Sequence, residues 1–146
     1  MSNTARVIVP ALTEAELLTM SEEDYMNEAQ LAFFENLLAA MRVELVEEIR
    51  QVRLELVVGG DREADEVDQA ASEEERWLNL RIHERKTYLI RKVDEAMRLI
   101  QSGDYGWCED SGEPIGLKRL LARPTATLCI EAKERRECME RQRTED

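Results

Sequence analysis

Two long stretches of helical hydrophobic periodicity, separated by Gly59 and Gly60, constrain the fold of this 146-residue chain more than any other feature. In the first stretch, apolar residues recur every three or four positions, at Leu31, Phe34, Leu38, Met41, Leu45, Ile49, Val52 and Leu56. The second has a less regular stripe, formed by Val67, Ala71, Leu78, Ile82, Leu89, Val93, Ala96 and Ile100. Such spacing is typical of helices that bury one face. Neither helix can cover its stripe alone, so the pattern predicts an antiparallel coiled-coil hairpin.

The ends of these helices carry recognisable signals. Ser21-x-x-Asp24 has the form of a capping box and predicts the opening of the first helical pattern, with a helix over 27–58. The paired glycines that follow end it, because glycine loses the most backbone entropy in a helix and readily adopts the left-handed C-cap conformation. The second helix is expected from about Glu66 to Ser102, before Gly103. The turn near residues 59–70 then becomes an exposed tip.

The remaining segments complete a mainly α fold. Residues 1–24 are expected to form an N-terminal leader, mobile over 1–20 apart from a short helix capped by Thr13-x-x-Glu16. The hairpin occupies 25–103. Residues 104–128 are rich in glycine and proline turns and predict a compact, zinc-ribbon-like knot, and residues 129–146 predict a charged C-terminal helix.

The knot carries two incomplete metal motifs. They read Cys108-Glu109-Asp110-Ser111 and Cys129-Ile130-Glu131-Ala132, with cysteine at only two of the four outer positions. A structural zinc ion takes four nitrogen or sulfur ligands in a closed tetrahedron. His83 lies in the middle of a predicted helix, and Cys138 lies outside the ligand spacing, so neither is expected to complete the set. We therefore expect a degenerate site at Cys108, Ser111, Cys129 and Ala132, with no zinc and no other required cofactor.

The charge of the chain limits its partners. The formal net charge is −12, which argues against independent binding to DNA, RNA or anionic membranes, because those affinities depend on neutralisation of phosphates by lysine and arginine. No apolar run reaches the length of a membrane span. Three cysteines without a disulfide framework are typical of a reducing compartment. The sequence thus predicts a cytoplasmic, soluble protein, expected to be a monomer.

Acidic residues gather at the expected tip, where the chain reads Asp65-Glu66-Val67-Asp68-Gln69-Ala70. Considered alone, Asp65 and Asp68 are most simply a helix cap and a favourable charge at the positive end of the helix dipole. They could also form an acid/base pair or bind Mg²⁺, but no histidine or lysine is close in sequence, and we do not expect an enzyme. A third interpretation is that the hairpin carries the acidic tip into a partner.

A basic cluster contrasts with this overall acidity. It comprises Arg91, Lys92, Lys118, Arg119, Arg123, Lys133, Arg135 and Arg136. For most of these residues we expect ion pairs with the abundant glutamates. If Lys92, Arg123 and Lys133 converge, they would form a site for a compact polyphosphate anion.

Over about Tyr25 to Arg143 the chain resembles the DksA family of bacterial transcription factors. The resemblance rests on Tyr25-Met26-Asn27-Glu28-Ala29-Gln30-Leu31, Asp65-x-x-Asp68-x-Ala70, Gly106-Trp107-Cys108-Glu109 and the segment from Arg119 to Ile130 that contains Arg123-Pro124-Thr125-Ala126. It implies a coiled coil that enters the secondary channel of RNA polymerase without binding DNA. Asp65, Asp68 and Ala70 would be the effector residues at the tip.

The resemblance also implies a ligand and a regulatory role. Leu89, Lys92, Arg123 and Lys133 stand where the family contacts the alarmone ppGpp, together with polymerase. Inhibition of ribosomal RNA promoters in the stringent response would follow. At the metal positions the chain departs from the family pattern, and there it is most similar to cysteine-poor, zinc-independent paralogues. The alternative functions are a structural coiled-coil adaptor with no direct effect on polymerase and a small hydrolase or metal enzyme.

Overall fold

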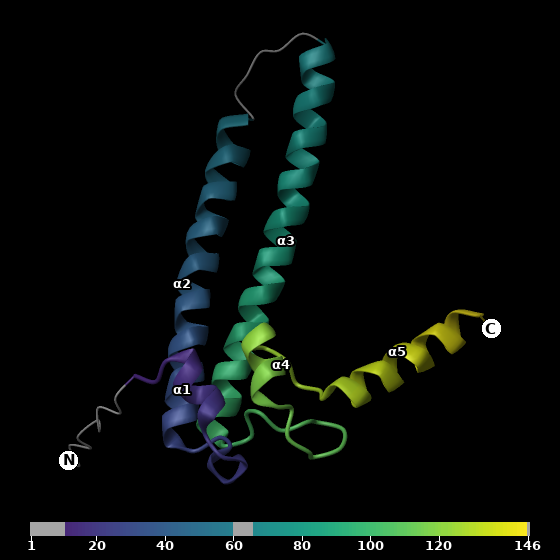
Figure 1. Cartoon of the computed structure of the whole chain (residues 1–146). Helices are drawn as coiled ribbons and strands as arrows, with labels where there is room; N and C mark the ends of the chain where they lie inside the picture. The colour runs from purple at the N-terminus through teal and green to yellow at the C-terminus, as the bar shows by residue number, and fades with distance from the viewer. Residues whose placement is uncertain (1–10, 60–65, 146) are drawn as a thin grey trace. The chain divides into compact units, whose positions relative to one another are not determined.

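The computed structural model describes residues 11–59 and 66–145, which are mostly helical (Figure 1). The elements in chain order are α1 (Glu14–Thr19), the 3₁₀ turn η1 (Glu22–Asp24), α2 (Glu28–Gly59), α3 (Glu66–Ser102), α4 (Leu117–Ala122) and α5 (Ile130–Glu145). They form two compact units. The hairpin unit is Ala39–Glu95, and the knot unit is the described part of Met1–Leu38 and Ala96–Asp146. Within the described ranges, no helix combines the length and apolarity needed to cross a bilayer.

The hairpin unit confirms the predicted antiparallel pairing. Three polar contacts join α2 to α3 within it, between Arg42 and Asp94 (2.8 Å), Glu48 and Lys86, and Arg53 and His83 (3.2 Å). As the residue number rises along α2, the number of its partner falls along α3. The two helices therefore run in opposite directions in a constant register, as Figure 1 also shows.

The core of the hairpin unit is narrow and partly polar. Ile49, Val52 and Val93 are buried, but the predicted stripe on the second helix is wrong at Leu78 and Ile82, which are 49% and 41% exposed. A seven-residue repeat counted back from Val93 falls on Lys86 and Asn79, both half-buried. The face of α3 that packs against α2 therefore includes these polar residues. Which face a long helix buries depends on the partner against which it packs.

The start of α2 differs from the predicted one. Asn27 caps this helix, since its Oδ1 accepts a hydrogen bond of 2.9 Å from the N–H of Gln30. The hydroxyl of Ser21 instead donates to Asp24 within η1, at 3.1 Å. Met26, with a φ of 56°, separates η1 from α2. The left-handed backbone at this residue interrupts the helical path, so the prediction that the Ser21 box opens the long helix is wrong.

The knot unit has a well-packed apolar core. Phe34, Leu38, Leu120 and Tyr105 are almost completely buried, and the rings of Phe34 and Tyr105 lie 5.5 Å apart. The Tyr105 hydroxyl donates to the carbonyl of Pro124 at 2.7 Å, which satisfies its polar atom inside the core. Leu17 of α1 is 0% exposed. This part of the N-terminal leader therefore packs into the fold, on the side of α4.

Candidate functional site

Tyr25 fixes the turn-rich part of the knot to the start of α2. Its hydroxyl donates to the carbonyl of Gly106 at 2.6 Å and accepts from the N–H of Gly116 at 3.0 Å. Its ring meets that of Trp107 edge to face, with centroids 5.3 Å apart. Burial raises the pKa of Tyr25, although the backbone hydrogen bonds act in the opposite direction. The hydroxyl therefore stays protonated and can hold both ends of the loop.

Between these two anchored glycines the chain forms a tight loop. Ile115 donates to Gly106 at 2.9 Å, and Cys108 donates to Glu113 at 2.8 Å. Trp107 and Pro114 form an isolated antiparallel β-bridge. These bonds close the loop over residues 106–115 and place Cys108 and Ser111 on the same turn.

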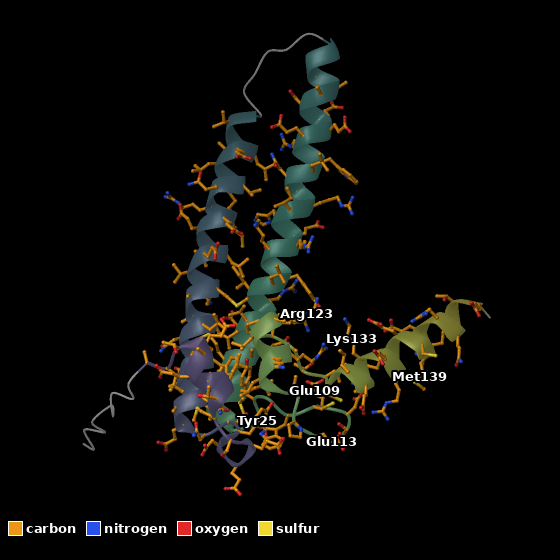
Figure 2. The ribbon with its side chains drawn as sticks, viewed as in Figure 1. Tyr25, Glu109, Glu113, Arg123, Lys133 and Met139 are labelled. Atoms are coloured by element: carbon orange, nitrogen blue, oxygen red, sulfur yellow. The ribbon has the colours of Figure 1, made fainter. Side chains whose placement is uncertain are left out.

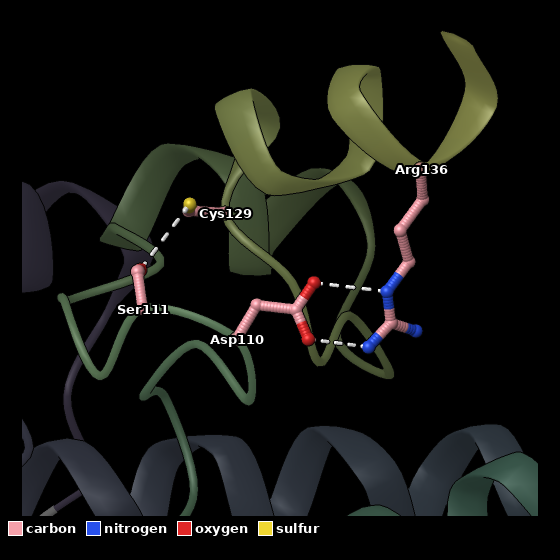
Figure 3. A network of polar contacts seen from close by, with 4 residues as sticks. All are labelled: Asp110, Ser111, Cys129 and Arg136. Carbon is pink, nitrogen blue, oxygen red and sulfur yellow. Dashed lines mark hydrogen bonds and ion pairs between the residues drawn. The ribbon is translucent and has the colours of Figure 1, made fainter. Parts of the chain in front are cut away.

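Three of the four positions of the degenerate metal site, Cys108, Ser111 and Cys129, come together in the structure, and the fourth, Ala132, is buried. Cys108, Cys129 and Ala132 are 3%, 9% and 1% exposed, and the Ser111 hydroxyl lies 3.8 Å from the sulfur of Cys129 (Figure 3). The loop supplies the first pair and the start of α5 supplies the second. The arrangement thus keeps the two halves of a ribbon-type site in contact.

The Cys108 thiol is held in a polar environment. Burial raises the pKa of this thiol, but hydrogen bonds from the Ser111 side chain and from the backbone N–H groups of Cys129, Ser111 and Asp110 outweigh it. The net result is a pKa of about 6. A thiolate at neutral pH is a good hydrogen-bond acceptor, which suits the donors that surround it.

The donor set does not fit structural zinc. Ala132 supplies no ligand atom, and Ser111 supplies a neutral hydroxyl where a thiolate would be needed. Cys138 is exposed, in the later part of α5. In the segments that the structure describes, no three histidine, cysteine, aspartate or glutamate residues are grouped as a metal site would require. The residues present therefore give no basis for a metal-dependent step.

A two-point ion pair, not predicted from the sequence, lies beside this site. The guanidinium of Arg136 in α5 donates to the carboxylate of Asp110 from Nε at 2.9 Å and from Nη2 at 2.5 Å (Figure 3). The hydrogen bond from Arg136 lowers the pKa of Asp110. Asp110 stands inside the first incomplete metal motif, and this position is the only local signal that could have marked it.

The four predicted contacts with ppGpp divide between the two units. Leu89 and Lys92 lie one turn apart on α3 in the hairpin unit, where Lys92 approaches Glu95 at 3.4 Å and the Tyr88 ring at 5.4 Å. Arg123 and Lys133 belong to the knot unit and are labelled in Figure 2.

Local contacts fix the pair in the knot unit. Arg123 ends α4, and the following Pro124 accepts the buried hydrogen bond from Tyr105. Lys133 lies in the first turn of α5 and approaches Glu137 at 3.6 Å. Its side chain is 40% exposed, so it can reach an anion at the surface.

The predicted tip residues are only partly described. Asp65 lies outside the described residues, and so does the side chain of Asp68, although its backbone is in the first turn of α3. Ala70 is exposed in the same helix. The role of these three residues stays a prediction.

Two family models match consecutive parts of the chain. Residues 30–100 match "DnaK suppressor protein DksA, N-terminal domain", and residues 103–138 match "Prokaryotic dksA/traR C4-type zinc finger". The first match covers most of α2 and α3, and the second covers the loop, α4 and the first half of α5. The zinc-finger match therefore includes the segment in which two ligand cysteines are replaced.

Individual relatives agree with these matches. RNA polymerase-binding transcription factor DksA of Caulobacter vibrioides is 42% identical over 98% of this chain and 99% of its own length. The protein of the same name from Escherichia coli is 42% identical over 82% of this chain and 80% of its own. Among solved structures, transcription factor DksA2 from Pseudomonas aeruginosa has a TM-score of 0.81 and 51% identity, and the match covers 88% of this chain and 99% of that one.

Proposed function

The chain belongs to the DksA family, and from this premise we propose that it regulates transcription by binding RNA polymerase. The observation that carries the proposal is the 42% identity to an RNA polymerase-binding transcription factor across almost the full length of both chains. The antiparallel hairpin unit supports it, because a hairpin of this kind can carry its turn into a partner. As a member of a family of transcription factors, the chain is not an enzyme.

The finer proposal concerns how the protein acts. The turn between α2 and α3 enters the secondary channel of polymerase, and Asp65, Asp68 and Ala70 destabilise short-lived promoter complexes there. The net charge of −12 supports a route to promoters through polymerase, since direct DNA binding would need a basic surface. We further propose that the protein acts as a monomer in the cytoplasm and does not bind membranes.

The proposed effector is ppGpp, held between this protein and polymerase by Leu89, Lys92, Arg123 and Lys133. Phosphate groups are recognised by lysine and arginine through charge-assisted hydrogen bonds. Arg123 is exposed and Lys133 is half-buried, with its charged end opposite Glu137. A bound polyphosphate would compete with that glutamate for the lysine.

Zinc independence is the last part of the proposal. It is supported by the incomplete donor set and by the polar contacts that join the same two segments. Polar side chains of this chain thus join the two segments that a four-cysteine site would join through a metal ion. The knot is expected to keep its fold in a chelator.

The test is single-round transcription from a ribosomal RNA promoter by purified polymerase, in a zinc chelator, with and without ppGpp. The parent protein should inhibit, and ppGpp should enhance the inhibition. Asp68→Asn should abolish inhibition, whereas Glu73→Gln, an equal change of charge at an exposed position of α3, should not. If neither the parent nor any variant affects transcription, the chain is a coiled-coil adaptor for another partner.

The ppGpp contacts have matched controls. Lys92→Ala and Lys133→Ala should each weaken the response to ppGpp about tenfold or more, because a hydrogen bond to a charged group contributes roughly 1.5–3 kcal/mol. Arg91→Ala and Arg135→Ala remove the same charge from exposed neighbours and should leave the response unchanged. Equal losses in both sets would show a general electrostatic effect and contradict a specific site.

A further inference from the structure

A C4 metal site cross-links two segments of chain, one for each pair of ligands. The corresponding segments here are the loop 108–113 and residues 127–136, which include the start of α5. Their donor set does not fit zinc, so the cross-link must have another origin if α5 is to stay in a fixed orientation. Among the described residues, the contacts of this kind are the hydrogen bond from the backbone N–H of Cys129 to the Cys108 thiol and three others.

The other three contacts differ in strength. The N–H of Glu109 donates to the carbonyl of Thr127 at 2.9 Å, before α5 begins. The hydroxyl oxygen of Ser111 and the sulfur of Cys129 are 3.8 Å apart, at the distance of a weak hydrogen bond between a hydroxyl and a thiol. The ion pair between Asp110 and Arg136 is the only one of the three that reaches into the second turn of α5. It is also bidentate, which fixes direction as well as distance.

We propose that the Asp110–Arg136 ion pair, assisted by the Ser111–Cys129 contact, takes the place of the metal cross-link and positions α5 against the loop 108–113. Ala132, 1% exposed, packs at the buried base of the helix and serves as the pivot. Arg136 lies four residues further along, or about 6 Å at 1.5 Å per residue. A restraint at that distance limits rotation of the helix about its base.

Arginine suits this position better than lysine. Its planar guanidinium presents two parallel N–H groups to one carboxylate, whereas a lysine ammonium makes a point contact with no preferred direction. Both side chains are partly exposed, at 51% and 36%. The restraint is therefore modest in energy and is screened by salt, in contrast to a metal site, which is sensitive to chelators.

The inference does not depend on polymerase and can be tested on the full-length protein alone. Hydrogen exchange of the α5 amides would be measured by mass spectrometry for the parent, Asp110→Asn, Arg136→Gln and the double variant. The matched control is Arg141→Gln, at an exposed arginine of the same helix for which no ion pair is found among the described residues. Circular dichroism would establish that every variant keeps the helical content of the parent.

Each single variant should speed exchange in α5 about two- to fivefold, the range for a partly exposed ion pair. The double variant should exchange no faster than the singles, because both remove the same contact. Salt at 1 M should speed exchange in the parent, and a zinc chelator should not. Arg136→Lys should give an intermediate rate.

Three results would overturn the proposal. Arg136→Gln could behave like Arg141→Gln, which would mean that the ion pair does not restrain α5. The effects of the two single variants could add, which would show that the residues act separately. A chelator could speed exchange in the parent, and a bound metal would then be the cross-link.

Discussion

Substitution of Gly106 by alanine should destabilise the knot unit much more than the same substitution at Gly112. Both glycines have positive φ, at 90° and 73°. A Cβ on Gly112 meets nothing within 4 Å, whereas a Cβ on Gly106 would lie 2.8 Å from Cγ and Sδ of Met26 and 3.2 Å from the Tyr25 hydroxyl. Comparison of the two substitutions therefore separates the cost of backbone strain from the cost of a steric conflict.

The expected cost follows from these two contributions. The left-handed backbone costs an alanine about 1–2 kcal/mol, and the lower entropy of the unfolded chain returns about 0.4–1 kcal/mol. Gly112→Ala should therefore lower the free energy of unfolding by about 1 kcal/mol. Overpacking against Met26 adds roughly 1–3 kcal/mol at Gly106, so Gly106→Ala should lose about 3 kcal/mol.

Urea denaturation followed by tryptophan fluorescence measures both values. Trp107 reports on the right region, because its ring contacts that of Tyr25. A Trp77→Phe background removes the signal of the other tryptophan, which is 57% exposed on α3. Met26→Ala in the Gly106→Ala protein should recover part of the loss by removing the opposing atoms. Equal losses at the two glycines, or no recovery, would refute the steric argument.

Three further predictions concern the metal site, the buried tyrosine and the hairpin core. The double change Ser111→Cys with Ala132→Cys should create a zinc site of one ion per chain, measurable by metal analysis, because it supplies thiolates at all four motif positions, of which Cys108, Ser111 and Cys129 already meet; no zinc after refolding with the metal would contradict the shared geometry. Burial raises the pKa of Tyr105, so the folded state retains a proton that the unfolded state releases above about pH 10. Stability should be constant below that pH and should fall by up to about 1.4 kcal/mol per pH unit above it, and Tyr105→Phe should reduce this slope in urea titrations. Val93→Ala should lower the free energy of unfolding by about 2 kcal/mol, because Val93 is buried. Val43→Ala, at a residue that is 72% exposed in the same unit, should change it very little. Equal shifts in the urea midpoint would count against a core at Val93.

The sequence predicted the long helices well because their signals are local. The expected helix over 27–58 is found at Glu28–Gly59, and the one from Glu66 to Ser102 is found with the same ends. Hydrophobic spacing, paired glycines and the single Gly103 act within a few residues along the chain. The same local pattern failed at Leu78 and Ile82, because the face that a long helix buries depends on its partner.

The candidate site was predicted less completely. Its four degenerate ligand positions could be read from the two motifs, since the spacing of such motifs reflects a local turn. The ion pair between Asp110 and Arg136 could not be predicted, because 26 residues separate its members. The tip residues Asp65 and Asp68 rest on resemblance alone.

The sequence by itself determined that this chain forms two long helices, that its knot lacks two of four metal ligands, and that its acidity disfavours direct DNA binding. Only the tertiary structure decided which residues hold the knot. Tyr25 joins Gly106 and Gly116 across 81 and 91 residues of sequence, and Leu17 is buried in the same unit. The physical reason is the range of the interactions: helical periodicity acts over three or four residues, whereas the contacts within the knot join residues far apart in sequence and form only after the chain has folded back on itself.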